Sequence, residues 1–70
     1  MQLTVNGKDA VIEGKESLNI TSLLDVLKVK DALYVTVELN GEILDRPTFD
    51  DTIVKDGDSL EFLYFMGGGR

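Results

Sequence analysis

The side chains that carry most enzyme chemistry are missing from this sequence of 70 residues, which contains no histidine and no cysteine. Histidine is the commonest general base, and cysteine is an intrinsically strong side-chain nucleophile. Their absence also removes disulfides, thiolate chemistry and the usual zinc ligands. We therefore predict that the chain is not an independent enzyme and that any chemistry it takes part in uses another group.

The end of the chain offers such a group. Five large apolar residues at positions 62–66 lead directly into Gly67–Gly69, and Arg70 is the last residue. Glycine loses the most conformational entropy on folding and packs no side chain, so this run cannot serve stability. It is either a frayed terminus, which is common, or a flexible thread whose backbone fits a channel that any Cβ would block.

Two acidic clusters, Asp50-Asp51 and Asp56-Gly57-Asp58, share residue types with calcium-binding loops. An EF-hand needs its ligands at fixed positions of a loop that ends in glutamate, and neither cluster follows that pattern. Aspartate and glycine are also the residues that favour tight turns. We therefore predict that these residues shape turns and that the chain binds no metal.

The charge balance narrows the classes of partner. Thirteen acidic residues outweigh seven basic ones, which gives a net charge of −6. Binding to nucleic acid needs clustered lysine and arginine, and the sequence has no such cluster. No signal peptide is visible, and no apolar run approaches the roughly 20 residues that span a bilayer. We expect a cytoplasmic protein without a nucleic-acid or membrane partner, whose acidic surface suits a basic protein.

The first part of the chain has the pattern of a hairpin followed by a helix. Residues 1–6 alternate as a half-buried strand does, and Asn6-Gly7 predicts a tight turn into a second strand at Ala10–Glu13. Asn19 is well placed as an N-cap, and the helix is predicted to end near residues 28–29, with lysines in its last turn. The apolar face of this helix consists of Ile20, Leu23, Leu24 and Leu27.

The rest of the chain returns to the period of strands, with turn signals between them. Pro47 interrupts this pattern because proline cannot donate to a strand ladder. In chain order the predicted elements are a strand from Leu33, the Asn40-Gly41 turn, a strand over residues 42–44, an irregular turn or short helix over residues 48–53, the turn Lys55–Asp58 and a strand from Leu60 to about Met66.

These elements follow the order β-β-α-β-β-β, in which two hairpins flank one helix and the last strand can pair in the middle. The order predicts an α+β fold, a mixed sheet of four to five strands with one helix packed across one face. The side chains expected to face the helix are Leu3, Val5, Val35, Val37, Leu39, Leu60 and Phe62.

The opposite face of the last strand is a candidate interaction surface. Alternation places Leu63 and Phe65 on that face with Glu61, and Tyr34 lies on it one strand away. Because one helix covers only one face, these apolar side chains are expected to be exposed, and clustered exposed apolar residues mark interaction surfaces. We predict that Leu63, Phe65 and Tyr34 dock a partner. The alternatives are that the tail or a second copy covers them, or that the end of the strand twists them inward.

In this order and at this length, the elements and the glycines resemble the β-grasp sulfur carriers of the ThiS type, from thiamine biosynthesis. That family is related to the small subunit of molybdopterin synthase and to ubiquitin. The stretches that carry the resemblance are NITSLLDVL (residues 19–27), VELNGEIL (37–44), VKDGDSLEFL (54–63) and GGG (67–69). The resemblance covers essentially the whole chain and implies a β-grasp domain at residues 1–66 and a flexible glycine-rich tail at residues 67–70.

The resemblance implies that the reactive group is the C-terminal carboxylate. In such carriers a separate E1-like enzyme uses ATP and magnesium to convert the last glycine to an acyl adenylate. Sulfur then displaces AMP and leaves a thiocarboxylate, which a further enzyme, thiazole synthase in the thiamine case, uses as its sulfur source. A carrier of this kind binds no cofactor of its own and needs no catalytic side chain, which agrees with the missing histidine and cysteine.

Arg70 departs from the family pattern, which ends in Gly-Gly. The resemblance implies that the adduct forms on Gly69 after loss of Arg70, with Gly68 as the second choice, and that Gly67 and Gly68 form the thread. Three explanations of Arg70 compete: a C-terminal peptidase removes it, it is left over from expression, or the protein has lost the carrier function.

Alternatives to a thiamine carrier follow from the same resemblance. Related carriers serve cysteine, methionine and molybdopterin synthesis, and the arginine extension favours one of those pathways slightly. Two alternatives belong to other functional classes. The chain is comparable to a ubiquitin-like modifier, which is joined to lysines, or to a β-grasp adaptor whose C-terminal tail takes part in no reaction.

Overall fold

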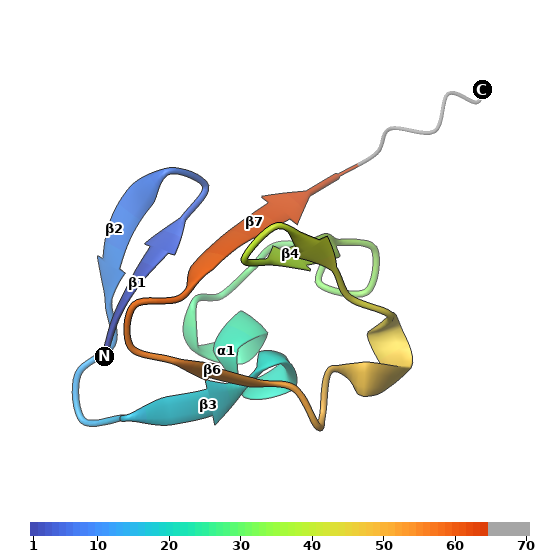
Figure 1. Cartoon of the computed structure of the whole chain (residues 1–70). Coiled ribbons are helices and arrows are strands. Elements are labelled where there is room, and N and C mark those ends of the chain that lie inside the picture. Colours follow the sequence, from blue (N-terminus) through green and yellow to red (C-terminus); the bar gives the residue numbers. More distant parts are fainter. Residues whose placement is uncertain (65–70) are drawn as a thin grey trace.

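The computed structural model describes residues 1–64, so Phe65, Met66 and the predicted tail at residues 67–70 lie outside the described residues. Within residues 1–64 the chain forms two sheets and one α-helix (Figure 1). The elements are β1 (Gln2–Val5), β2 (Lys8–Val11), β3 (Ser17–Asn19), α1 (Ile20–Val26), β4 (Thr36–Leu39), β5 (Glu42–Ile43), the 3-10 helix η1 (Arg46–Thr48), β6 (Ile53–Lys55) and β7 (Ser59–Leu63).

The larger sheet has five strands in the order β2-β1-β7-β4-β5. β7 runs parallel to β1 and antiparallel to β4, and the two hairpins β1–β2 and β4–β5 flank it. This arrangement confirms the predicted mixed sheet, in which the last strand of the chain lies in the middle. Within the described residues β7 ends at Leu63, opposite Thr36, the first residue of β4, and Tyr64 lies outside the strand. The predicted continuation of the strand over Phe65 and Met66 lies outside the described residues.

The smaller sheet pairs β3 with β6, and the sequence reasoning missed both strands. Residues 48–53 were expected to form an irregular turn or short helix, but Ile53 already belongs to β6 and pairs with Asn19. The short helix lies earlier, at Arg46–Thr48, because Pro47 suits the first turn of a helix, where its missing N–H costs nothing. Strands of three residues that pair over a long separation leave no local periodic signal.

Both Asn-Gly pairs form tight hairpin turns, as predicted. Asn6 and Asn40 have φ of +51°, the left-handed conformation that asparagine tolerates and that matches the twist of the flanking strands. Pairing resumes at Lys8, directly after the first turn, so β2 covers Lys8–Val11. The predicted range Ala10–Glu13 was therefore two residues too late.

α1 begins where the sequence indicated and ends earlier. The Oδ1 atom of Asn19 accepts a hydrogen bond from the Ser22 N–H at 2.8 Å, which confirms the N-cap. The predicted end near residues 28–29 was wrong, because Val26 is the last helical residue and Lys28 has φ of +54°. A residue in the left-handed region ends a helix, so the lysines lie beyond the last turn rather than in it.

The core lies between α1 and the five-stranded sheet. Figure 1 shows α1 enclosed by this sheet and by the β3–β6 pair. Helix residues Ile20, Leu23 and Leu24 are buried there. Of the side chains predicted to face the helix, Leu3, Val35, Val37, Leu60 and Phe62 are buried, and Val5 and Leu39 pack against them partly exposed. The opposite face of the sheet is uncovered by any helix of the described residues.

Candidate functional site

β7 is the strand that leads to the C-terminal glycines, and the two hairpin turns hold it from both sides. On the β1 side, Asn6 Oδ1 accepts a hydrogen bond from the Phe62 N–H at 2.8 Å. On the β4 side, Asn40 Oδ1 accepts one from the Ser59 N–H at 2.9 Å. Each asparagine side chain thus provides an acceptor for a backbone N–H of β7 that lies next to the end of a strand ladder. The position of β7 is therefore fixed near both of its ends.

The aspartates before β7 shape its entry turn. The carboxylate of Asp58, which is buried, accepts hydrogen bonds from the Lys55 N–H at 2.9 Å and from Asn40 Nδ2 at 3.1 Å. Asp56 Oδ1 accepts one from the Gln2 N–H at 2.6 Å. These contacts agree with the predicted turn role. Within residues 1–64, no group of three or more acidic, histidine or cysteine side chains could hold a metal ion.

The far end of β7 lies against the segment between α1 and β4. Leu63 is the last residue of β7 and pairs with Thr36. Tyr64 follows it, and its hydroxyl donates a hydrogen bond to the backbone carbonyl of Lys30. The point from which residues 65–70 continue is therefore connected to the segment 28–35, called the connecting loop below.

The connecting loop starts with a Schellman motif, the hydrogen-bond pattern that commonly caps the C-terminus of a helix. The Val29 N–H bonds to the Leu24 carbonyl at 3.0 Å, and the Lys28 N–H to the Asp25 carbonyl at 3.1 Å. Lys28 takes the left-handed position that glycine usually occupies, with φ of +54°. The motif fixes the direction in which the connecting loop leaves α1.

Arg46 holds the other end of the connecting loop. Its guanidinium donates to the carbonyls of Ala32 at 2.9 Å and Val35 at 2.7 Å. Its Cζ atom lies 5.1 Å from the centre of the Phe49 ring, within the range of a cation–π contact. A planar guanidinium can bridge two carbonyls in this way, so one side chain from η1 secures the second half of the loop.

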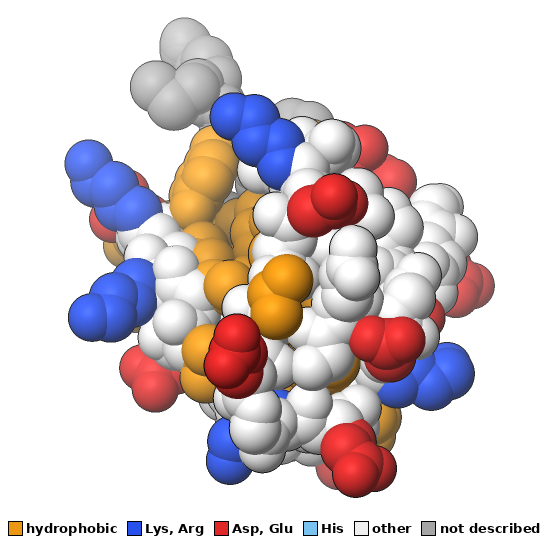
Figure 2. All heavy atoms as spheres, turned by 90° about the vertical axis from the view of Figure 1, so that its left-hand side faces the viewer, with side chains coloured by type: hydrophobic (Ala, Val, Ile, Leu, Met, Phe, Trp, Pro, Cys, Tyr) orange, Lys and Arg blue, Asp and Glu red, His pale blue; other side chains and the backbone are white. Residues whose placement is uncertain are grey.

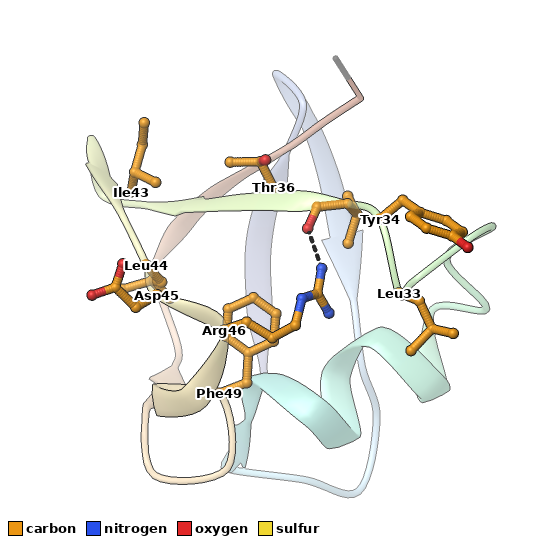
Figure 3. Close-up of a pocket in the computed structure, with 9 residues that line it drawn as sticks. Leu33, Tyr34, Thr36, Ile43, Leu44, Asp45, Arg46 and Phe49 are labelled. Carbon is orange, nitrogen blue, oxygen red and sulfur yellow. Dashed lines mark hydrogen bonds between the residues drawn. The ribbon is translucent and has the colours of Figure 1, made fainter. Parts of the chain in front are cut away.

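A hollow of about 230 Å³ opens beside the connecting loop, at the β5 edge of the sheet. Figure 3 shows Leu33 and Tyr34 at one end of it and Ile43 at the other, with Arg46 and Phe49 between them. Leu33 and Tyr34 are 78% exposed and Ile43 is 61% exposed. These apolar side chains give the hollow an exposed hydrophobic rim.

The predicted docking residues lie in different elements. Leu63 is half-buried at the end of β7, on the face of the sheet away from α1. Tyr34 is exposed, but it belongs to the connecting loop rather than to the predicted strand, because β4 begins only at Thr36, the strand partner of Leu63. Phe65 lies outside the described residues, as do the predicted adduct and thread residues Gly67, Gly68 and Gly69 and the terminal Arg70.

Two exposed side chains and one contact at this end of the molecule were missed. Ile43 was predictable, because the Asn40-Gly41 turn sets it opposite Glu38, whose side chain alternation places away from the core. Leu33 and the Tyr64–Lys30 hydrogen bond have no signal in the sequence, since both depend on the path of the connecting loop.

The surface is mixed in charge. In Figure 2, which faces the β1–β2 side, hydrophobic side chains gather in a strip beside Lys and Arg side chains, and acidic side chains are spread over the rest of the face. On the uncovered face of the sheet, Glu38 and Glu61 lie directly opposite each other on β4 and β7.

No helix within residues 1–64 has the length and apolar character needed to cross a membrane.

Comparisons with known proteins agree with this geometry. The chain matches the model of the ThiS family over residues 2–69. The crystal structure of a thiamine biosynthesis protein (ThiS) from Geobacter metallireducens is 68% identical, with a TM-score of 0.94, and the match covers 99% of this chain and 100% of that one. A solution structure of a thiamine biosynthesis protein from the same organism is 67% identical, with a TM-score of 0.79, over 100% of this chain and 90% of that one.

A thiazole synthase from Paramagnetospirillum magneticum is 38% identical over 69 residues, which are 99% of this chain. The chain spans only 20% of the length of that relative. The family model and the crystal structure, in contrast, each match nearly the whole chain. On this evidence the chain belongs to the ThiS family and has its β-grasp fold.

Proposed function

We propose that this chain is a sulfur carrier in thiamine biosynthesis and that its reactive group is the carboxylate of Gly69, exposed after removal of Arg70. The observation that carries the proposal is the ThiS family match, which extends to Gly69 and leaves Arg70 outside. The likeness to a thiamine biosynthesis protein over 99% of the chain supports the thiamine pathway.

The proposed chemistry needs activation by a second protein. A carboxylate is a poor electrophile, so an oxygen of the Gly69 carboxylate attacks the α-phosphorus of ATP on an E1-like enzyme, and magnesium pyrophosphate leaves. A sulfide or persulfide sulfur then attacks the acyl carbon of the adenylate, and AMP leaves with one carboxylate oxygen. A persulfide donor also needs a thiol to release the new sulfur. The product is a thiocarboxylate.

The carrier itself acts as a protein co-substrate in this scheme. ATP and magnesium belong to the activating enzyme, and the carrier contributes a terminus that reaches the active site. The central position of β7, held by Asn6 and Asn40, supports this role because it fixes the strand from which the terminus extends. Gly67 and Gly68 form the thread in this proposal, since a chain without Cβ atoms passes the narrowest channel.

The proposed partners are three enzymes: an activating enzyme, a sulfur acceptor and a C-terminal peptidase. The activating enzyme docks on Leu63, Phe65 and Tyr34, and the exposure of Tyr34 supports this assignment. Thiazole synthase is the proposed sulfur acceptor, because a protein of that name contains a stretch similar to this whole chain within 20% of its length. A C-terminal peptidase removes Arg70 and leaves Gly68-Gly69.

The test compares two forms of the protein, one that ends at Gly69 and one that ends at Arg70. Each is incubated with the E1-like enzyme of the same organism, magnesium ATP and sulfide, and its intact mass is measured. The form that ends at Gly69 is expected to exchange one oxygen for sulfur, and the form that ends at Arg70 is expected to stay unchanged. An unchanged mass of the Gly69 form contradicts the carrier function, and equal conversion of both forms contradicts the need for trimming.

A further inference from the structure

We propose that Tyr64 is a positioning residue for the reaction at the C-terminus. Its hydroxyl, bonded to the Lys30 carbonyl, fixes the point from which the reactive segment leaves the fold. This inference rests on the proposed function, since it assigns a role in charging to a residue that does not touch the reacting atoms.

Within residues 1–64, the strand pairing of β7 ends just before Tyr64. In this part of the chain the ladder with β1 ends at Leu60, and beyond it the Phe62 N–H bonds to the Asn6 side chain. The ladder with β4 ends at Leu63. Beyond Leu63, the hydrogen bond of the Tyr64 side chain continues the attachment of this strand to the fold.

The acceptor of that hydrogen bond is itself held firmly. Lys30 lies between the Schellman motif, which ends at Val29, and the carbonyl of Ala32, which accepts a hydrogen bond from Arg46 at 2.9 Å. The Tyr34 N–H bonds to the Asp31 carbonyl at 2.8 Å and closes a turn between them. The connecting loop is therefore an anchor for Tyr64 that is fixed at both ends.

The hydroxyl of Tyr64 contributes to placement more than to folding. Tyr64 is 45% exposed, so water can replace a lost hydrogen bond at the Lys30 carbonyl. A carrier without the hydroxyl keeps its sheet, its core and its docking face. It loses the contact that holds Tyr64 to the connecting loop, so fewer docked complexes place the terminus correctly.

The test is the kinetics of charging by the E1-like enzyme, with the Gly69 form of the carrier as the varied substrate. Tyr64→Phe is expected to lower kcat about three- to tenfold, the range that one lost hydrogen bond gives, and to leave KM unchanged. Thr52→Val is the matched control. It also removes a hydroxyl-to-carbonyl hydrogen bond, from Thr52 to Thr48 at 2.8 Å, but in the segment between η1 and β6, outside both β7 and the connecting loop, and kcat should stay at the parent value.

A second measurement does not depend on activity. The backbone amide order parameter of Tyr64 is expected to fall in Tyr64→Phe, while the order parameters of residues 59–62 stay unchanged. If Tyr64→Phe shows the parent kcat, raises KM alone or leaves the order parameter of Tyr64 unchanged, the positioning role is overturned. If the parent carrier is never charged, that result contradicts the proposed function instead. The order parameter of Tyr64 then still shows whether the hydroxyl anchors this residue.

Discussion

The side-chain oxygen of Asn6 accepts a hydrogen bond from the backbone N–H of Phe62, at 2.8 Å and across 56 positions of sequence. Asn6 occupies the left-handed region at the tip of the first hairpin, with φ of +51°. One residue therefore forms the turn that closes β1–β2 and also secures β7, the strand that carries the C-terminus. The same side chain therefore contributes both to a local turn and to the placement of a strand that is distant in sequence.

Asn6→Ala is expected to lower the free energy of unfolding by about 2 kcal/mol, because it leaves the Phe62 N–H without its acceptor and puts an unfavourable residue in the left-handed region. Asn6→Asp keeps an acceptor oxygen and tolerates that region, so it should stay within about 0.5 kcal/mol of the parent. Urea denaturation measures both variants. Equal losses for the two variants would show that the acceptor contributes nothing.

Lys28→Gly is expected to stabilise the protein by about 1 kcal/mol, because Lys28 holds the left-handed position of the Schellman motif without the freedom of glycine. Lys30→Gly is the control, since Lys30 is not among the residues with positive φ. That substitution should be neutral or destabilising, because glycine only adds entropy to the unfolded chain. Thermal unfolding of both variants, at matched pH and salt, tests the contrast.

Glu61→Lys is expected to stabilise the sheet by about 0.5 kcal/mol, because it replaces a like-charge pair with Glu38 by an opposite-charge pair. Both positions are on the solvent side of the sheet, so the gain should shrink as salt is added. Glu13→Lys changes the net charge equally at an exposed position outside the strands. If both variants show the same gain, the effect comes from overall charge rather than from the cross-strand pair.

Arg46→Lys is expected to loosen the connecting loop although it keeps the charge. A lysine cannot bridge the carbonyls of Ala32 and Val35 with a planar fork, so one of two hydrogen bonds is lost. We expect a loss of about 1 kcal/mol in unfolding free energy and faster amide hydrogen exchange over residues 31–36. Unchanged exchange in this segment would contradict the role given to Arg46.

Leu63→Ser tests the proposed docking face. Removing an apolar side chain that becomes buried against a partner is expected to raise KM for charging by the E1-like enzyme about tenfold, with little change in kcat. Val11→Ser is the control, because Val11 is 64% exposed on the outer strand β2. A KM that rises equally in both variants would point to a general loss of folded protein, which circular dichroism would reveal.

The sequence by itself determined the features that depend on neighbouring residues. The left-handed preference of Asn and Gly placed both hairpin turns, although the strand after the first turn was predicted two residues too late. The oxygen of Asn19 marked the start of α1. Strict alternation identified Val35, Val37, Leu60 and Phe62 as core residues. Each of these follows from backbone dihedrals or from a period of two or 3.6, which a short stretch of sequence carries in full.

Only the tertiary structure decided the features that join distant segments. The β3–β6 pairing, the bridge from Arg46 to the connecting loop and the Tyr64–Lys30 contact each depend on where two segments meet in space. The end of α1 belongs with them, because Lys28 takes its unfavourable conformation where Val29 packs against the core. No short stretch of sequence encodes such contacts, since their free energy arises only when the whole chain has folded.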